Sequence, residues 1–228
     1  MRLIGMLDSP YVRRVAISLE YLGVAFDHES VSVFSTFEKF QGINPVVKAP
    51  TLVCGDGEVL MDSSLILQFV EAAKAKGKSL WSRDPAELQH EFRAVSVALA
   101  ACEKSVQIVY ERNLRPAPAQ YEPWVARVTG QLLAAYAGLE REVGQRQAGF
   151  AVAGNQASIT AAVAWKFTQS MLAAIVPASR YPALVGLSAR MEQTPEFRKY
   201  PSDGPGVPKT EDAPKAGAPQ RQRKHRAS

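Results

Sequence analysis

The chain has 228 residues, 46% of them hydrophobic, and a formal net charge of +5 at pH 7. This composition excludes a wholly disordered chain and provides for one large or two small domains with their own cores. Cys54 and Cys102 lie far apart, without the spacing of a metal site or an evident disulfide pair. Because no leader pattern precedes the fold, we expect a reduced, cytoplasmic protein.

The positive charge is concentrated at the end of the chain. Residues 202–228 contain six lysines and arginines against three acidic residues, which leaves only +2 for the rest. Four prolines, no aromatic residue and one branched aliphatic residue provide too little apolar surface to offset the cost of ordering. We therefore expect a disordered basic tail. Its final RQRKHR could contact nucleic acid, but a solvated tail is the more common behaviour, so no nucleic-acid partner is predicted.

The first eighty residues alternate between strand and helix patterns. Apolar residues at helical spacing follow a short strand, and later a Gly55-Asp56-Gly57 turn joins two strands into a hairpin. The predicted elements are a strand over 2–6, a helix ending at Gly23, a strand over 26–33, a helix over 35–41, strands over 51–54 and 58–61, and a helix from 62–64 to near Gly77. The order is βαβαββα.

From Pro85 to about Tyr200 the pattern is helical, with no convincing strand. Four helices are predicted, over residues 88–109, 121–143, 158–176 and 181–193. The apolar run within 159–176 is interrupted by polar residues, which predicts a buried helix and no membrane span. The third helix begins at Ser158 with only half of a capping box, because Ala161 stands where the acidic residue is expected.

The fold class is therefore α/β followed by all-α. The domains are predicted as an α/β domain over 1–78, a linker over 79–85, a helical domain over 86–201 and the tail over 202–228. No phosphate-binding glycine loop, zinc spacing or serine-hydrolase elbow occurs, and the three histidines form no cluster. No metal is predicted.

Three short motifs point to a family. They are SPYVRR at the first helix, NPVVKAPTL before a strand and LMDSSLI at the next helix. In this order, and followed by a helical domain, they resemble the glutathione transferase family over residues 1 to about 200. The resemblance implies a thioredoxin-like amino-terminal domain, an all-helical carboxy-terminal domain, glutathione as co-substrate, a homodimer and a role in detoxification.

The first motif raises a question about Ser9. A serine before Pro10 is an ordinary helix cap, and the residue pattern alone leaves that interpretation open. In the family a serine here donates a hydrogen bond to the glutathione thiolate. Members that reduce disulfides have cysteine at this place, because thiol exchange needs a nucleophilic sulfur. The resemblance therefore implies that Ser9 is catalytic and that glutathione supplies the sulfur.

The second and third motifs would hold the peptide. The resemblance implies that Pro50 is cis and turns the backbone of Ala49 toward glutathione, and that Lys48 faces the glycyl carboxylate. It also implies that Asp62 faces the γ-glutamyl ammonium and Ser63 the γ-glutamyl carboxylate. Asp62 and Ser63 are equally credible as helix caps, and the two roles are compatible because a helix start binds anions.

The expected function is a glutathione transferase that activates the thiol for attack on an apolar, small-molecule electrophile. Aromatic residues are candidates for the walls of the electrophile site: Tyr11, Phe34, Tyr110 and Trp165. Two alternatives remain open. One is a non-catalytic binding or regulatory module on the same fold. The other is a glutathione-dependent isomerase or lyase, which would share every residue named above.

Overall fold

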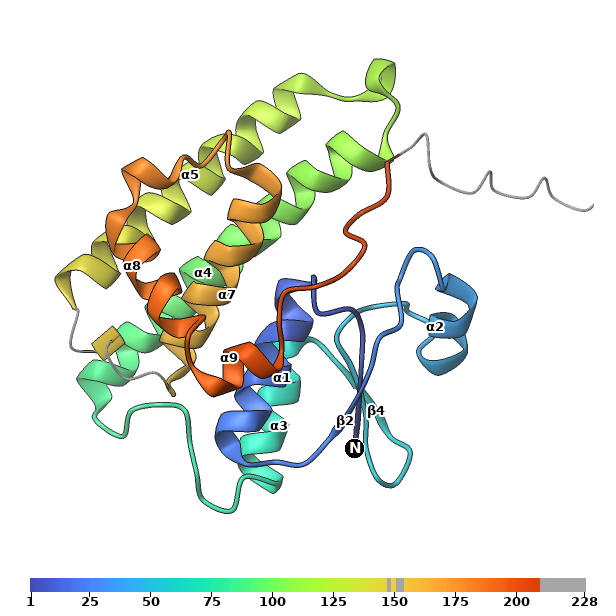
Figure 1. Ribbon diagram of the computed structural model, residues 1–228, viewed down its shortest axis with the longest axis vertical. Coiled ribbons are helices and arrows are strands. Elements are labelled where there is room, and N and C mark those ends of the chain that lie inside the picture. The colour runs from blue at the N-terminus through green and yellow to red at the C-terminus, as the bar shows by residue number, and fades with distance from the viewer. Residues whose placement is uncertain (147–148, 151–153, 210–228) are drawn as a thin grey trace, which may run out of the picture.

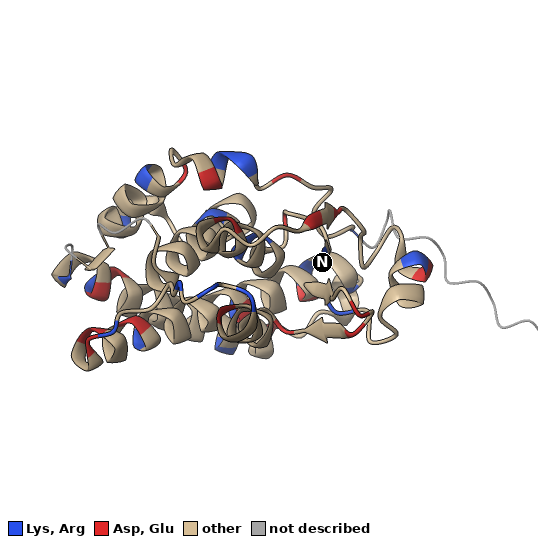
Figure 2. Cartoon of the chain, turned by 90° about the horizontal axis from the view of Figure 1, so that it is seen from below, with Lys and Arg blue, Asp and Glu red and all other residues tan. Residues whose placement is uncertain are grey.

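The computed structural model describes residues 1–146, 149–150 and 154–209. Figure 1 shows a small sheet with its helices, formed by the first part of the chain, beside a bundle of longer helices. Acidic and basic residues are interspersed over both parts (Figure 2). Among the described helices, none is both long enough and apolar enough to cross a membrane.

The amino-terminal part has the predicted βαβαββα order. Its elements are β1 (Arg2–Ile4), α1 (Pro10–Leu22), β2 (Asp27–Glu29), α2 (Phe37–Ile43), β3 (Thr51–Val53), β4 (Val59–Met61) and α3 (Ser63–Ala73). The strands lie in the order β2-β1-β3-β4, with β1 parallel to β2 and the other pairs antiparallel. This mixed sheet confirms the thioredoxin-like fold class.

The second strand is shorter than the predicted 26–33. It ends at Glu29 because the chain turns at Ser32, whose hydroxyl accepts hydrogen bonds from the backbone N–H groups of Phe34 and Ser35. The backbone N–H of Ser32 in turn donates to the hydroxyl of Thr36. These local bonds replace a sheet ladder. The turn brings Val33 and Phe34 to the edge of a cavity described below.

The carboxy-terminal part is helical, as predicted. It contains α4 (Pro85–Leu114), α5 (Glu122–Gln145), α7 (Gln156–Leu172), α8 (Pro182–Met191) and α9 (Pro195–Lys199), with single 3-10 turns at Ala117–Ala119 and Ala178–Arg180. The short α9 was not predicted, although Thr194 caps it through the backbone N–H of Phe197. Its core residue Phe197 is fully buried.

The start of α7 differs from the prediction. The cap is Asn155 and not Ser158, because the Asn155 side chain accepts a 2.7 Å hydrogen bond from the backbone N–H of Ser158. The Asn155 amide also donates to the backbone carbonyl of Gly149. The helix therefore has a complete amide cap, and the missing acid at Ala161 leaves no defect.

Helix α1 joins the two parts of the molecule. It packs against α3 on one side and α7 on the other, and most of its residues are buried. Arg13, in this helix, forms a two-pronged ion pair with Glu192 at 2.6 and 2.7 Å and also donates to the backbone carbonyl of Tyr200. The hydrophobic core continues through the contact between α1 and α7, so the position of α1 fixes one part against the other.

The chain after α9 returns to the amino-terminal part. The backbone N–H of Gly206 donates a 2.8 Å hydrogen bond to the Asp8 carboxylate, and the Asn113 amide donates to the carbonyl of Val207. Figure 1 shows this segment running from α9 past the start of α1 toward the end of α4. The prediction of a disordered tail is therefore wrong for residues 202–209; residues 210–228 lie outside the described residues.

Two truncations test this contact. Removing residues 202–228 should lower the melting temperature by roughly 3 to 6 °C, because the hydrogen bonds of residues 206 and 207, one of them to a carboxylate, contribute about 1 to 2 kcal/mol. Removing only 210–228 is the matched control, since it leaves both hydrogen bonds in place, and should change the melting temperature little. Equal melting temperatures for the two shortened chains would show that residues 202–209 do not stabilise the fold.

Candidate functional site

A cavity of about 430 Å³ lies between the two parts of the molecule, within the range of small-molecule sites. It is bordered by the start of α1, the turn after β2, the segment before β3, and residues of α4 and α7. The side chains that line it are mostly apolar and include Met6, Tyr11, Val33, Phe34, Tyr110, Phe167 and Met171. The residues after α9 complete it through Gly206 and Val207. It therefore suits an apolar molecule.

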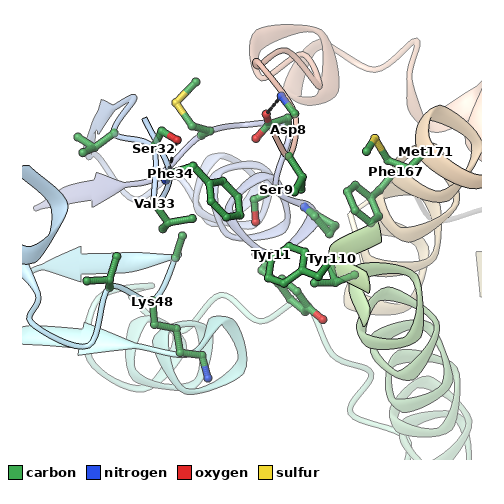
Figure 3. A pocket seen from close by; sticks show the side chains of 18 of the residues that line it. Asp8, Ser9, Tyr11, Ser32, Val33, Phe34, Lys48, Tyr110, Phe167 and Met171 are labelled. Atoms are coloured by element: carbon green, nitrogen blue, oxygen red, sulfur yellow. Dashed lines mark hydrogen bonds between the residues drawn. The ribbon is translucent and has the colours of Figure 1, made fainter. Parts of the chain in front are cut away.

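Ser9 lies in this cavity. Figure 3 shows its side chain between the ring of Phe34 on one side and those of Tyr110 and Phe167 on the other. Ser9 occupies the N-cap position of α1 with extended backbone dihedrals, but its hydroxyl makes no capping hydrogen bond. The helix instead begins with Pro10, which needs no partner for a backbone N–H. The capping interpretation of the Ser9 hydroxyl is thus wrong, and the hydroxyl is available to a molecule in the cavity.

The segment before β3 forms the boundary between this cavity and a second hollow. The Ala49–Pro50 peptide bond is cis, as the resemblance implied. Lys48 and Ala49 line both spaces, whereas Pro50 lines only the second. Figure 3 shows the ammonium of Lys48 pointing away from the aromatic rings.

The second hollow has a volume of about 600 Å³, and more of its lining side chains are polar than in the first cavity. It is lined by Asp62, Ser63 and Ser64 at the start of α3, together with residues of the middle of α4. The Asp62 carboxylate accepts hydrogen bonds from the backbone N–H groups of Ser64 (2.9 Å) and Leu65 (3.4 Å) through Oδ1. Asp62 is therefore a helix cap, and its other oxygen is not used in that cap.

Two features of Asp62 favour a further role. Its φ of 71° is rare for residues other than glycine, and such conformations concentrate at functional sites. Its Oδ2 lies 3.7 Å from Nζ of Lys48, and both side chains are about half exposed. An exposed pair of this kind contributes little to stability, so both charges remain available to a ligand.

The six predicted site residues are thus brought together. Ser9 faces the apolar cavity, the acidic and hydroxyl side chains of Asp62 and Ser63 face the polar hollow, and Lys48 and Ala49 connect the two. An extended peptide could lie along the hollow with one end at α3 and its middle at Ala49. This arrangement matches the predicted placement; the role of each residue remains a prediction.

The electrophile walls were predicted less well. Tyr11, Phe34 and Tyr110 line the apolar cavity, but Trp165 does not. Trp165 is buried in the helical core, where its ring packs against Tyr136 and Tyr181. The cavity instead receives Phe167 and Met171, four residues apart on one face of α7. Helical spacing could have identified this pair, but not which face of α7 meets the cavity.

Sequence reasoning missed Asp8 altogether. The Asp8 carboxylate lines the cavity beside Ser9, and burial raises its pKa, an effect opposed mainly by the hydrogen bond from Gly206. A cavity-side carboxylate anchors residues 202–209 at this place. No local pattern links Asp8 to a segment so far along the chain.

Comparisons with known proteins agree with this geometry. The model of the glutathione S-transferase N-terminal domain matches residues 3–78. Residues 3–78 therefore belong to the glutathione transferase family. A GST-like protein of Escherichia coli K12, YibF, is 28% identical over 127 residues, 56% of this chain and 62% of YibF. Glutathione S-transferase U3 of Arabidopsis thaliana is 31% identical over 87 residues, 37% of this chain and 35% of the plant enzyme. The matched segments thus span less than two thirds of these relatives.

Solved structures of family members match over a greater length. A glutathione S-transferase of Methylobacterium radiotolerans, in complex with glutathione sulfonate, is 26% identical with a TM-score of 0.76, covering 91% of this chain and 94% of that one. A family member from Pseudomonas fluorescens Pf-5, with bound S-(propanoic acid)-glutathione, is 25% identical with a TM-score of 0.72, covering 88% and 98%. The helical part therefore shares the family fold as well.

Proposed function

We propose that the protein is a glutathione transferase that binds glutathione in the polar hollow and an apolar electrophile in the adjoining cavity. The observation that carries the proposal is the uncapped Ser9 hydroxyl, which lies in the cavity within the motif that also begins α1. Because the described fold leaves this donor to a ligand, it can stabilise a thiolate at the boundary of the two spaces. Glutathione is the co-substrate, and no metal takes part in the proposal.

The peptide would lie extended across the site. The backbone of Ala49 pairs with the cysteinyl unit as an added strand would. Lys48 neutralises the glycyl carboxylate, Asp62 faces the γ-glutamyl ammonium, and Ser63 with the start of α3 faces the γ-glutamyl carboxylate. This orientation directs the thiol toward Ser9.

Chemistry would begin with ionisation of the thiol, which releases its proton to water. A free thiol has a pKa near 8.5, so only a few per cent is thiolate at pH 7. The Ser9 hydroxyl donates to the thiolate, and the positive end of α1 favours the anion. The sulfur then attacks the electrophile, forming the C–S bond as the leaving group departs or a strained ring opens. The apolar walls place the electrophile and exclude water.

The electrophile site, the assembly and the location are part of the same proposal. Four segments supply its apolar walls: the turn at Phe34, α4 with Tyr110, α7 with Phe167, and the residues after α9 with Val207. We infer a two-fold homodimer, because Met61, Leu65 and Phe92 are large apolar side chains left exposed on the single chain. A role in detoxification in the cytoplasm fits an enzyme that consumes cellular glutathione.

Ser9→Ala tests the proposed chemistry. A hydrogen bond to an anion contributes about 1.5 to 3 kcal/mol, so its loss should raise the pKa of bound glutathione by about 1 to 2 units. Turnover at pH 7 should fall on the order of ten- to a hundredfold, less a partial offset from the greater nucleophilicity of the more basic thiolate. The direct measurement is ultraviolet titration of the bound thiolate in both proteins.

Two controls accompany that titration. Ser9→Thr keeps a hydroxyl and should retain most of the pKa shift. Because the Ser9 hydroxyl makes no cap, Ser9→Ala should change the free energy of unfolding by less than about 0.5 kcal/mol. Superimposed thiolate titrations of wild type and Ser9→Ala would refute the catalytic role. Glutathione binding without turnover of any halogenated, epoxide, peroxide or isothiocyanate substrate would favour the non-catalytic binding module.

Asp62→Asn tests the peptide site without removing the helix cap. The asparagine side-chain carbonyl can still accept from Ser64 and Leu65, so the fold should be kept while the negative charge is lost. Calorimetry should show glutathione binding weakened by about 1 to 3 kcal/mol, the range for a charge-assisted hydrogen bond. Unchanged affinity would restrict Asp62 to its capping role.

The proposed dimer has a test of its own. Leu65→Glu places a charge on a side chain that is 61% exposed in the single chain. Light scattering coupled to gel filtration should give twice the chain mass for wild type and a shift toward the single-chain mass for the variant, because burying an unpaired charge in an interface is costly. A wild-type mass equal to one chain would refute the dimer.

A further inference from the structure

Arg14 is a buried cation whose hydrogen-bond partners are all neutral. Its side chain lies in α1, and the residue is 2% exposed. The guanidinium donates to Gln156 Oε1 and Thr160 Oγ1 on α7, at 3.0 to 3.3 Å, and to the hydroxyls of Ser63 (3.2 Å) and Ser64 (3.1 Å) at the start of α3. No carboxylate of the described residues pairs with it. A buried charge without a counter-charge destabilises the fold, so the presence of an arginine at this position needs a functional explanation.

The ionisable neighbours of Arg14 do not supply that counter-charge. Burial raises the pKa of Cys102 to about 12, and burial likewise raises the pKa of Tyr11, so both groups are neutral at pH 7. Asp62 also acts on Arg14, but its side chain is about half exposed, so solvent screens its charge. Burial lowers the pKa of Arg14 itself to about 10, which still leaves it charged at neutral pH.

The neighbouring Arg13, in the same helix, is a buried arginine whose charge is balanced by a carboxylate. It is equally buried, at 1% exposed, but both of its terminal nitrogens donate to the Glu192 carboxylate. Arg13 points to the end of the helical part, whereas Arg14 points to the start of α3. One of the two buried arginines is therefore paired within the chain, and the other lies behind the polar hollow.

The hydrogen bonds of Arg14 also set the direction of two hydroxyl groups. A guanidinium only donates, so the oxygens of Ser63 and Ser64 accept from it, and their own hydrogens must point elsewhere. Both serines line the polar hollow. Their hydroxyls are thereby left to donate to a ligand there, at the positive end of a helix. On the far side, Gln156 is itself held by a 2.8 Å hydrogen bond to the Ser18 hydroxyl.

We propose that Arg14 is a positioning residue for the carboxylate of the γ-glutamyl unit. Its charge is compensated when that carboxylate binds, and its hydrogen bonds turn the Ser63 and Ser64 hydroxyls toward it. The inference rests on the proposed function, which places this carboxylate at α3. Because Arg14 is also bonded to Gln156 and Thr160, α7 would contribute to glutathione binding although none of its residues lines the polar hollow.

The test compares two ligands and two variants. The ligands are glutathione and its analogue with a 4-aminobutanoyl group in place of γ-glutamyl, which keeps the ammonium and lacks only the carboxylate. Calorimetry on wild type should show glutathione preferred by about ten- to a hundredfold, the range for a hydrogen bond to a charged group. Arg14→Met should lose most of this preference by weakening glutathione binding while leaving binding of the analogue within about twofold.

Arg13→Met is the matched control, since it removes an adjacent buried arginine of the same helix. It should lower the melting temperature by leaving Glu192 unpaired and should keep the preference for glutathione. Arg14→Gln, which removes the charge but keeps a donor for the serines, supplies the same comparison if Arg14→Met does not fold. A preference that survives in the neutral variant, or equal weakening of both ligands, would overturn the role of Arg14. Failure of wild type to bind glutathione at all would instead refute the proposed function.

Discussion

The placement of α1 between the sheet domain and α7 is the constraint on which the rest of the structure depends. The helix is buried on both sides, so its register against α3 and α7 is fixed by packing and by its two arginines. Arg13 ties it to Glu192 and to the backbone of Tyr200, near the end of the helical part. A shift of α1 along its axis would move Ser9 out of the cavity and break these bonds together. The position of one hydroxyl is therefore determined by the contact between the two parts.

The two helices that begin at the site, α1 and α3, differ in how their first turns are capped. At α3 the Asp62 side chain satisfies the first amides, whereas at α1 the proline removes one such amide and the Ser9 hydroxyl is left free. The capped start keeps its helix stable while its serines face the hollow. The uncapped start exposes a donor in apolar surroundings, where a hydrogen bond to an anion is strengthened by the low dielectric. The guanidinium of Arg14, which belongs to α1, lies against Ser63 and Ser64 and so adds a positive charge at the start of α3.

Sequence reasoning identified what is encoded locally. The βαβαββα order and the four helices follow from periodicity and turn signals. The cis proline and the six candidate site residues were implied by the resemblance of three motifs to the glutathione transferase family. The turn at Ser32 and the Asn155 cap were missed because side-chain bonds to the backbone decided them. Docking of residues 202–209 on Asp8, burial of Trp165 and the missing counter-charge of Arg14 depend on contacts between distant segments. A helical pattern gives the spacing of Phe167 and Met171, but only the packing of α7 against α1 selects the face that reaches the cavity.

The polar hollow and the apolar cavity also differ in the segments of the chain that line them. The polar hollow is lined by Tyr11 and by residues within 48–64, all in the sheet domain, with further lining from α4. The apolar cavity adds residues of α4, α7 and the segment after α9, none of which contributes to the peptide motifs. Substitutions at Tyr110, Phe167 or Val207 can therefore change the shape of the apolar site while Lys48, Ala49 and Asp62 stay in place. On the proposed function, one fixed peptide site would serve many electrophiles, because the walls that select them are built from separate segments.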